Sequence, residues 1–123
     1  MRINRFEELE IWQLSRTLVK EIYKITNEVQ FKKDFALRDQ LRRAGLSVMS
    51  NIAEGFERKT RNELNQFLYI SKGSAGEVRS QLYVSYDLKY ISQEQFNELF
   101  NLSEKVTRKI SSFIKYLSSL KSK

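Results

Sequence analysis

The stretch SNIAEGFERKTRNE, residues 50–63, contains signals for the end of one helix and the start of the next. Gly55 lacks a Cβ atom and can adopt the left-handed conformation that ends many helices, so we expect it just after a helix that runs to Glu54. Thr60-Arg61-Asn62-Glu63 has the S/T-x-x-E form of a capping box, which marks a new helix. A connection this short predicts that the two helices are antiparallel neighbours.

Four segments of the chain repeat apolar residues every three or four positions, as amphipathic helices do. They run from about Arg5 to Glu28, from Phe35 to Glu54, from Arg61 to Leu88, and from a cap at Ser92 through a seam that ends at Leu120. This pattern predicts an all-α fold, an antiparallel up-down-up-down four-helix bundle in one domain, residues 1–123.

The expected helix starts are polar residues that can accept a hydrogen bond from the first turn. We expect Asn4 to cap the first helix with Glu7 three residues on, Asp34 to cap the second, and Ser92 to form a capping box with Gln95. The residues VQFKKD, 29–34, are expected to be a loop. Gly45 lies inside the second helix at a cost of ~1 kcal/mol relative to Ala, which predicts a close neighbour or a slight bend.

The composition narrows the possible chemistry. The chain has no cysteine and no histidine, so it lacks thiolate chemistry, the usual zinc ligands and the commonest general base. We therefore expect no metal and no cofactor. No apolar run is long enough to span a membrane, no helix pairs a cationic face with an exposed apolar one, and the N-terminus does not read as a signal peptide. These features predict a cytoplasmic protein with no membrane partner.

Glu54 is the one candidate for general acid chemistry, because a helix C-terminus favours its protonated form. It has no accompanying nucleophile, glycine-rich phosphate loop or second catalytic group in the sequence pattern. We therefore predict no catalytic residue, no enzyme activity and no small-molecule substrate. Asn51 and Glu54 are instead expected to bond to backbone groups at the corner or to a neighbouring subunit.

The chain is basic, with a net charge of +7, and residues 31–61 carry eight basic and four acidic side chains. Such a field favours polyanions or acidic partners. The candidate nucleic-acid contacts form two clusters, some 25–30 Å apart along a helix: Arg38, Arg42 and Arg43, then Arg58, Lys59 and Arg61. They would bind phosphates with little base readout. The alternative is a solvated face, because Asp39 and Glu57 lie beside the clusters.

The third helix carries a second line of residues about 100° from its core stripe. The line consists of Tyr69, Gly73, Gly76, Ser80, Tyr83 and Tyr90. Small residues permit close approach of another backbone, and tyrosine is enriched at protein interfaces. The pattern favours a homo-oligomer interface at Tyr69, Gly73, Gly76, Tyr83 and Tyr90. Alternatively, these tyrosines lie half exposed with their hydroxyls in water.

A family resemblance is carried by FEELEIWQLSRTLVKEIY and by the long run from LRDQL to RSQL. Its most specific pieces are Ser50-Asn51-Ile52-Ala53-Glu54-Gly55 and the run from Phe67-Leu68-Tyr69-Ile70 to Gly73-Ser74. The chain resembles the four-helix-bundle family encoded in intervening sequences of bacterial 23S rRNA genes, sometimes labelled S23 ribosomal protein. It is also similar to the accessory variability proteins of diversity-generating retroelements. Met49 replaces the proline that usually precedes the Ser-Asn, which should leave the second helix straighter.

The resemblance implies an up-down-up-down bundle assembled as a homopentamer. The retroelement relatives act as basic partners of a reverse transcriptase and its RNA, so the implied partner is RNA or a reverse-transcriptase-like nucleoprotein. No place in the ribosome is implied, and no catalytic residue carries over. Together, the residues and the resemblance predict a non-enzymatic RNA- or nucleoprotein-binding homo-oligomer. The alternative is a purely protein-binding or self-assembly module whose positive charge serves solubility.

Overall fold

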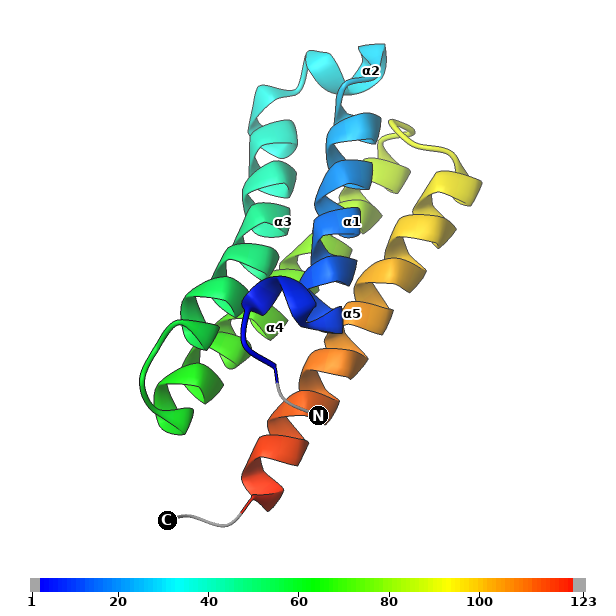
Figure 1. Ribbon diagram of the computed structural model, residues 1–123. Helices are drawn as coiled ribbons and strands as arrows, with labels where there is room; N and C mark the ends of the chain where they lie inside the picture. Colours follow the sequence, from blue (N-terminus) through cyan, green and yellow to red (C-terminus); the bar gives the residue numbers. More distant parts are fainter. Residues whose placement is uncertain (1–2, 121–123) are drawn as a thin grey trace.

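The structure is a computed structural model that describes residues 3–120. Four long helices pack side by side into a bundle, and no strand occurs within the described residues (Figure 1). The elements in chain order are η1 (Phe6–Glu8), α1 (Glu10–Thr26), α2 (Val29–Lys32), α3 (Phe35–Phe56), α4 (Arg61–Asp87) and α5 (Gln93–Ser119). The all-helical prediction is confirmed.

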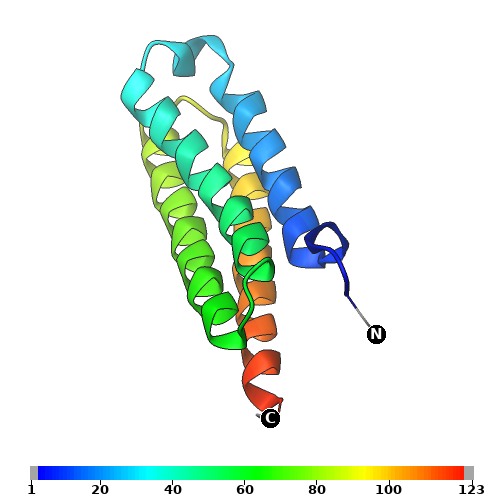
Figure 2. The same ribbon diagram turned by 60° about the vertical axis from the view of Figure 1, so that its left-hand side comes forward.

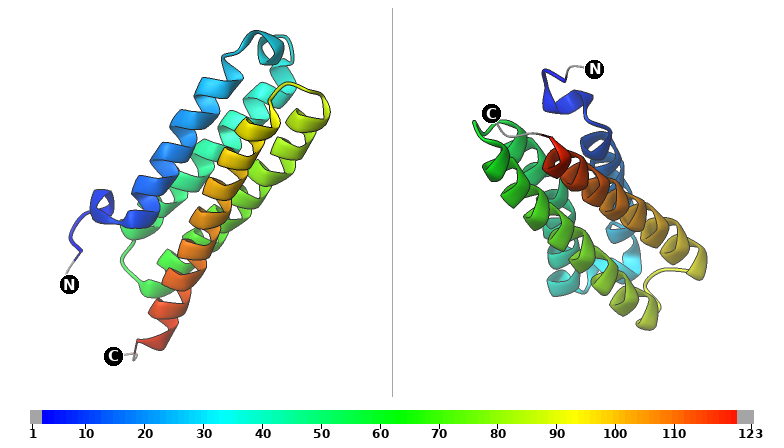
Figure 3. Two further views of the ribbon diagram at one scale, coloured as in Figure 1. Left: turned by 90° about the vertical axis from the view of Figure 1, so that its right-hand side faces the viewer. Right: turned by 90° about the horizontal axis from the view of Figure 1, so that it is seen from below.

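The connections between the long helices lie at the ends of the bundle. The short α2 joins α1 to α3 at one end, residues 57–60 join α3 to α4 at the other, and residues 88–92 join α4 to α5 (Figures 1 and 2). α1 and α4 each contact both α3 and α5, and the α3–α4 contact is the most extensive (Figure 3).

The core forms where the apolar stripes of the four helices meet. The fully buried large side chains include Leu18 and Ile22 of α1, Leu41 and Val48 of α3, Leu68 and Leu82 of α4, and Val106 and Ile110 of α5. Small polar residues complete the seams: Ser71 donates to the Val48 carbonyl at 2.6 Å, and Ser103 donates to the Ala75 carbonyl at 3.0 Å. These serines satisfy their hydroxyl groups while they keep neighbouring helices close.

The first helix begins later than expected, and the prediction that Asn4 caps it is wrong. α1 starts at Glu10, and extended Leu9 separates it from η1. Leu9 is buried in the core, and the ring of Phe6 packs against Trp12 at 5.2 Å between centroids. The break therefore lets both apolar residues reach the bundle. The backbone N–H of Asn4 donates to Glu8 at 3.2 Å instead.

The segment expected to be a loop contains the helical turn α2. Phe31 within it is fully buried, whereas Val29 at its start is exposed. Burial of one aromatic side chain fixes this turn against the bundle. The Asp34 cap is confirmed, because its side chain accepts from the Leu37 N–H.

Both remaining caps are confirmed. Thr60 accepts from the Glu63 N–H, and Ser92 and Gln95 form a complete capping box at the start of α5. Near the C-terminal end of α5, Ile114 is buried in the core, whereas its neighbour Phe113 is only partly buried.

Gly55 does not end α3 in a left-handed turn, so that prediction is wrong. The helix continues to Phe56, and no described glycine has a positive φ. A Cβ atom on Gly55 would lie 2.8 Å from the Cβ of Phe67 and 3.3 Å from the carbonyl oxygen of Leu64. Gly55 thus permits the close crossing of α3 and α4. The close neighbour expected at Gly45 is confirmed: a Cβ there would lie 2.7 Å from Ile22 Cδ1.

The left-handed helix end occurs at α4 rather than at α3. Lys89 has φ 63°, its N–H donates to the Tyr86 carbonyl, and the Tyr90 N–H donates to the Ser85 carbonyl. This is a Schellman arrangement with lysine where glycine is usual. It turns the chain so that Tyr90 packs on Phe31, with ring centroids 5.2 Å apart.

Candidate interaction surfaces

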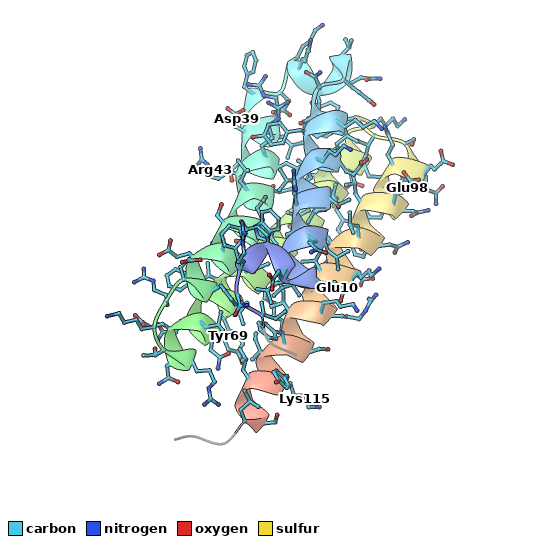
Figure 4. The ribbon with its side chains drawn as sticks, in the orientation of Figure 1. Glu10, Asp39, Arg43, Tyr69, Glu98 and Lys115 are labelled. Atoms are coloured by element: carbon cyan, nitrogen blue, oxygen red, sulfur yellow. The ribbon has the colours of Figure 1, made fainter. Side chains whose placement is uncertain are left out.

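The first predicted basic cluster lies on the half of α3 nearest α2. Arg38 donates from Nε to Asp39 at 3.0 Å, and its guanidinium lies 4.8 Å from the ring centroid of Phe35. Arg43 is exposed and has no hydrogen-bond or ion-pair partner among the described residues. Figure 4 shows Asp39 and Arg43 projecting from α3 into solvent. Arg38 is therefore partly neutralised, whereas Arg43 is not.

Arg42 is a cation whose orientation is fixed by the protein. Its Nε donates to the hydroxyl of Thr26 at 2.8 Å, and Thr26 is fully buried at the end of α1. Its guanidinium also lies 4.5 Å from the ring centroid of Tyr23. No carboxylate pairs with Arg42 within residues 3–120. The remaining N–H donors are thus held in place beside solvent, ready for an anion.

Two of the three residues in the second predicted cluster make contacts within the bundle. Arg58 forms an ion pair with Glu54 at 2.9 Å and lies 4.9 Å from the ring centroid of Phe67. Arg61 donates to the Leu117 and Leu120 carbonyls at 3.2 and 3.0 Å, so it caps the C-terminal end of α5. Lys59 is exposed in the connection between α3 and α4.

The two clusters do not form one patch. They lie at opposite ends of α3, a helix of 22 residues, which corresponds to about 30 Å of length. A polyanion that binds the first cluster must therefore find its other contacts on a different element.

Two cations of α1, Arg16 and Lys20, lie near the first cluster, and the sequence analysis did not identify them. Tyr23 borders two open depressions between α1 and α3, one of about 320 Å³ and one of about 650 Å³. The smaller is lined by Tyr23, Asp39, Arg42, Arg43 and Leu46; the larger is lined by Arg16, Val19, Lys20, Tyr23, Met49 and two further α1 residues. We call the two together the α1–α3 groove. Arg16, Lys20 and Tyr23 are spaced by four and three residues, which places them on one helical face.

The predicted tyrosine–glycine line lies on the outer face of α4. The exposed fractions of Tyr69 and Tyr83 are 57% and 53%, and Tyr69 is visible on α4 in Figure 4. A Cβ on Gly73 would meet nothing within 4 Å, and one on Gly76 would meet only Arg79, at 3.8 Å. Packing within the chain therefore does not require either glycine, although each costs ~1 kcal/mol in a helix interior.

Tyr90 lies beyond the end of α4, so the helical part of this line ends at Tyr83. The Tyr90 hydroxyl donates to Asp34 at 3.1 Å, and this hydrogen bond raises the pKa of Tyr90 above its ordinary value. Its ring packs on Phe31, as described above. Tyr90 thus makes its observed contacts inside the chain.

Asn51 bonds to a backbone group, as expected, but that group lies one turn back within α3, whereas the observed contact of Glu54 is with a side chain. Glu54 is exposed and pairs with Arg58, its neighbour one turn along the chain. Asn51 donates to the carbonyl and the hydroxyl of Ser47, and the Ser47 hydroxyl is bonded to that of Ser74 across the α3–α4 seam.

Within residues 3–120, no group of three or more acidic side chains is placed to hold a metal ion. No helix of this part of the chain has the length and apolar character needed to cross a membrane.

Comparisons with known proteins relate this bundle to one family. A search of curated proteins gives no significant match. Among solved structures, the chain is similar to a protein of unknown function from the S23 ribosomal protein family of Bacteroides thetaiotaomicron. The two share 27% sequence identity with a TM-score of 0.78, over 85% of this chain and 98% of that one. The model of the family described as 23S rRNA-intervening sequence protein matches residues 7–112. The chain therefore belongs to the 23S rRNA-intervening sequence protein family.

Proposed function

We propose that this protein is a non-enzymatic RNA-binding subunit. Its up-down-up-down bundle assembles into a homo-oligomeric ring, with five copies as the family resemblance implies, and it acts in the cytoplasm. Its partner is RNA or an RNA-bound protein such as a reverse transcriptase. The ring repeats one modest basic surface around its circumference, which multiplies weak phosphate contacts through effective concentration.

One observation carries the RNA-binding proposal: Arg42 and Arg43, adjacent in the chain, have no carboxylate partner among residues 3–120, and Arg42 is held in place by buried Thr26. A guanidinium that is already ordered loses little side-chain entropy when it binds phosphate. Arg38 and Arg58, in contrast, are paired with acidic groups. The family's link to 23S rRNA genes supports RNA as the polyanion.

The test is to recover bound nucleic acid from the native host. Tagged wild-type protein and the double variant Arg42→Gln/Arg43→Gln are purified, and the RNA on each is extracted and quantified. A control variant, Arg108→Gln/Lys115→Gln, removes the same charge from α5. We expect RNA on the wild type and on the control, and much less on the α3 variant. Equal RNA on all three proteins would show that these arginines do not bind it.

A second candidate function is self-assembly without a nucleic-acid role, and the α4 face favours it. Gly73 and Gly76 lie between Tyr69 and Tyr83 on α4, and both tyrosines are more than half exposed, although the Tyr83 ring also packs on Phe96 and Phe100 of α5. Light scattering coupled to size exclusion gives the mass of the particle at tens of micromolar protein. An oligomer that retains no RNA would favour this second function, whereas a monomer would exclude the ring.

A further inference from the structure

We infer that the α1–α3 groove binds unpaired nucleotides of single-stranded RNA, an inference that rests on the proposed RNA-binding function. It assigns the ligand class and adds Arg16, Lys20 and Tyr23 of α1 to the arginines of α3. The inference rests on a fixed arginine packed against an aromatic ring where two depressions meet at Tyr23. Cations of α1 border the larger depression, and cations of α3 border the smaller one.

The charge of the groove suits a polyanion. Arg16 and Lys20 line its larger part and Arg42 and Arg43 its smaller part. None of these four cations forms an ion pair within residues 3–120. The one acidic side chain in the groove, Asp39, already accepts from Arg38 at 3.0 Å. The groove therefore carries net positive charge over its length, along which a phosphate backbone can run.

The aromatic pairing at the centre of the groove distinguishes single strands from duplex. Tyr23 borders both depressions, and the Arg42 guanidinium lies 4.5 Å from its ring centroid. Unpaired bases stack on aromatic rings and on guanidinium planes, whereas the bases of a duplex are already stacked within the helix. Leu46, Val19 and Met49 supply apolar surface beside the ring. A base thus finds a stacking surface and its phosphates find cations within one groove.

Thr26 makes this arrangement stable before RNA arrives. Its buried hydroxyl accepts from Arg42 and itself donates to the Ile22 carbonyl at 2.7 Å. The guanidinium therefore keeps its place over Tyr23 and does not have to be ordered by the ligand.

The experiment measures fluorescence anisotropy of a labelled RNA of about 12 nucleotides, a length within the range of single-strand sites. The RNA has a mixed sequence without self-complementarity, and its duplex with the complementary strand is the second probe. Both are titrated with the wild type, Tyr23→Leu, Tyr23→Phe and Lys20→Gln. Tyr116→Leu is the matched control, because Tyr116 is an exposed tyrosine of α5. Thermal melts establish that each variant is folded.

We expect the wild type to bind the single strand more tightly than the duplex. Tyr23→Leu should lower single-strand affinity by about tenfold, the loss of roughly one stacked base. Tyr23→Phe, which keeps the ring, and Tyr116→Leu should bind like the wild type. Lys20→Gln should flatten the salt dependence by about 0.7 logarithmic units per decade of salt, the value for one single-strand phosphate contact.

The outcomes separate the inference from the function on which it rests. If RNA binds but Tyr23→Leu has no effect and duplex binds as well as single strand, the inference is overturned and RNA binding stands. If neither probe binds the wild type at low salt, both are overturned, and the groove would then be a candidate for a protein partner.

Discussion

The Nε atom of Arg42 lies 2.8 Å from the hydroxyl oxygen of Thr26, and this contact joins the outer surface of α3 to the buried end of α1. Thr26 is fully buried, whereas Arg42 is half-buried and reaches the surface beside Tyr23. The Thr26 hydroxyl already donates to the Ile22 carbonyl at 2.7 Å, so its burial does not by itself require Arg42 as a partner.

Replacement of Thr26 by valine tests whether this contact positions Arg42. The variant keeps the shape of the side chain but removes the acceptor, so Arg42 becomes mobile. We expect a loss of about 1 kcal/mol in unfolding free energy, typical of a lost hydrogen bond. RNA affinity should fall about three- to tenfold, the entropy of ordering one long side chain.

The serine variant is the matched control, because Thr26→Ser retains the hydroxyl. It should restore RNA affinity even where the lost methyl group lowers stability. Equal RNA affinity in Thr26→Val and wild type would mean that the contact is purely structural.

A methyl group at position 55 should destabilise the bundle. In Gly55→Ala the new Cβ would lie 2.8 Å from the Cβ of Phe67, an atom fixed to the α4 backbone. Overpacking of this kind costs about 1–3 kcal/mol, which exceeds the gain of ~1 kcal/mol in helix propensity. Chemical denaturation should show a lower unfolding free energy than for the wild type. An increase would show that α3 and α4 separate easily at this crossing.

The same change at Gly73 should have the opposite effect on a protomer. Its Cβ would meet nothing within 4 Å, so Gly73→Ala should stabilise the protomer by up to about 1 kcal/mol. If the outer face of α4 is the oligomer interface, Gly73→Arg should also reduce the particle mass measured by light scattering. Asn101→Arg, at an exposed site of α5, is the control. Retention of the full oligomer in Gly73→Arg would exclude this face.

The Tyr90–Asp34 hydrogen bond predicts a pH dependence at the alkaline end. The bond favours the protonated phenol, so the pKa of Tyr90 is raised in the folded state. Its contribution to stability is complete below the unfolded pKa of about 10 and is lost as the pH rises through the higher folded pKa. In an ultraviolet titration of the six tyrosines, the ionisation step at the highest pH should be absent from Tyr90→Phe.

The matched variant for this titration is Asp34→Asn, which keeps a side chain suited to the N-cap of α3 but removes the charge. The ionisation step of Tyr90 should then move to lower pH. A titration curve that is unchanged in Asp34→Asn would contradict the proposed cause of the shift.

The stripes of apolar residues predicted the bundle because burial of one helical face dominates its energetics. Leu18, Leu41, Leu68 and Val106, one from each of the four predicted helices, are fully buried. The errors fall where tertiary packing overrides a local signal. Leu9 interrupts the first helix to reach the core, and the sequence pattern around it reads as continuous helix.

The role of a glycine also depends on tertiary packing that the sequence pattern does not reveal. Gly55 and Gly45 both reflect close approach of a neighbouring helix, but only Gly45 was interpreted so. A glycine near an expected helix end fits either a left-handed turn or a tight crossing. The distinction requires the register between α3 and α4, which the order of residues does not contain.

The contacts of the basic residues could be predicted only where they lie within one helix, because contacts between helices depend on how the helices pack. The ion pair of Arg58 with Glu54 follows from a spacing of four residues, whereas the bonds of Arg61 to the end of α5 depend on how two distant helices pack. Arg16 and Lys20 lie in residues 1–30, where charges balance to zero, so the net charge of the segment concealed them. Their helical spacing was readable, but only the pairing of α1 with α3 brings them to Arg42.

The most direct test of RNA binding by the groove is the affinity of single-stranded RNA across a salt series, for the wild type and Arg42→Gln/Arg43→Gln. We predict a linear fall of log affinity with log salt. The slope of this line should be shallower in the variant by about 1.4, or 0.7 for each lost phosphate contact. An affinity that does not change with salt, or identical slopes for both proteins, would contradict the account.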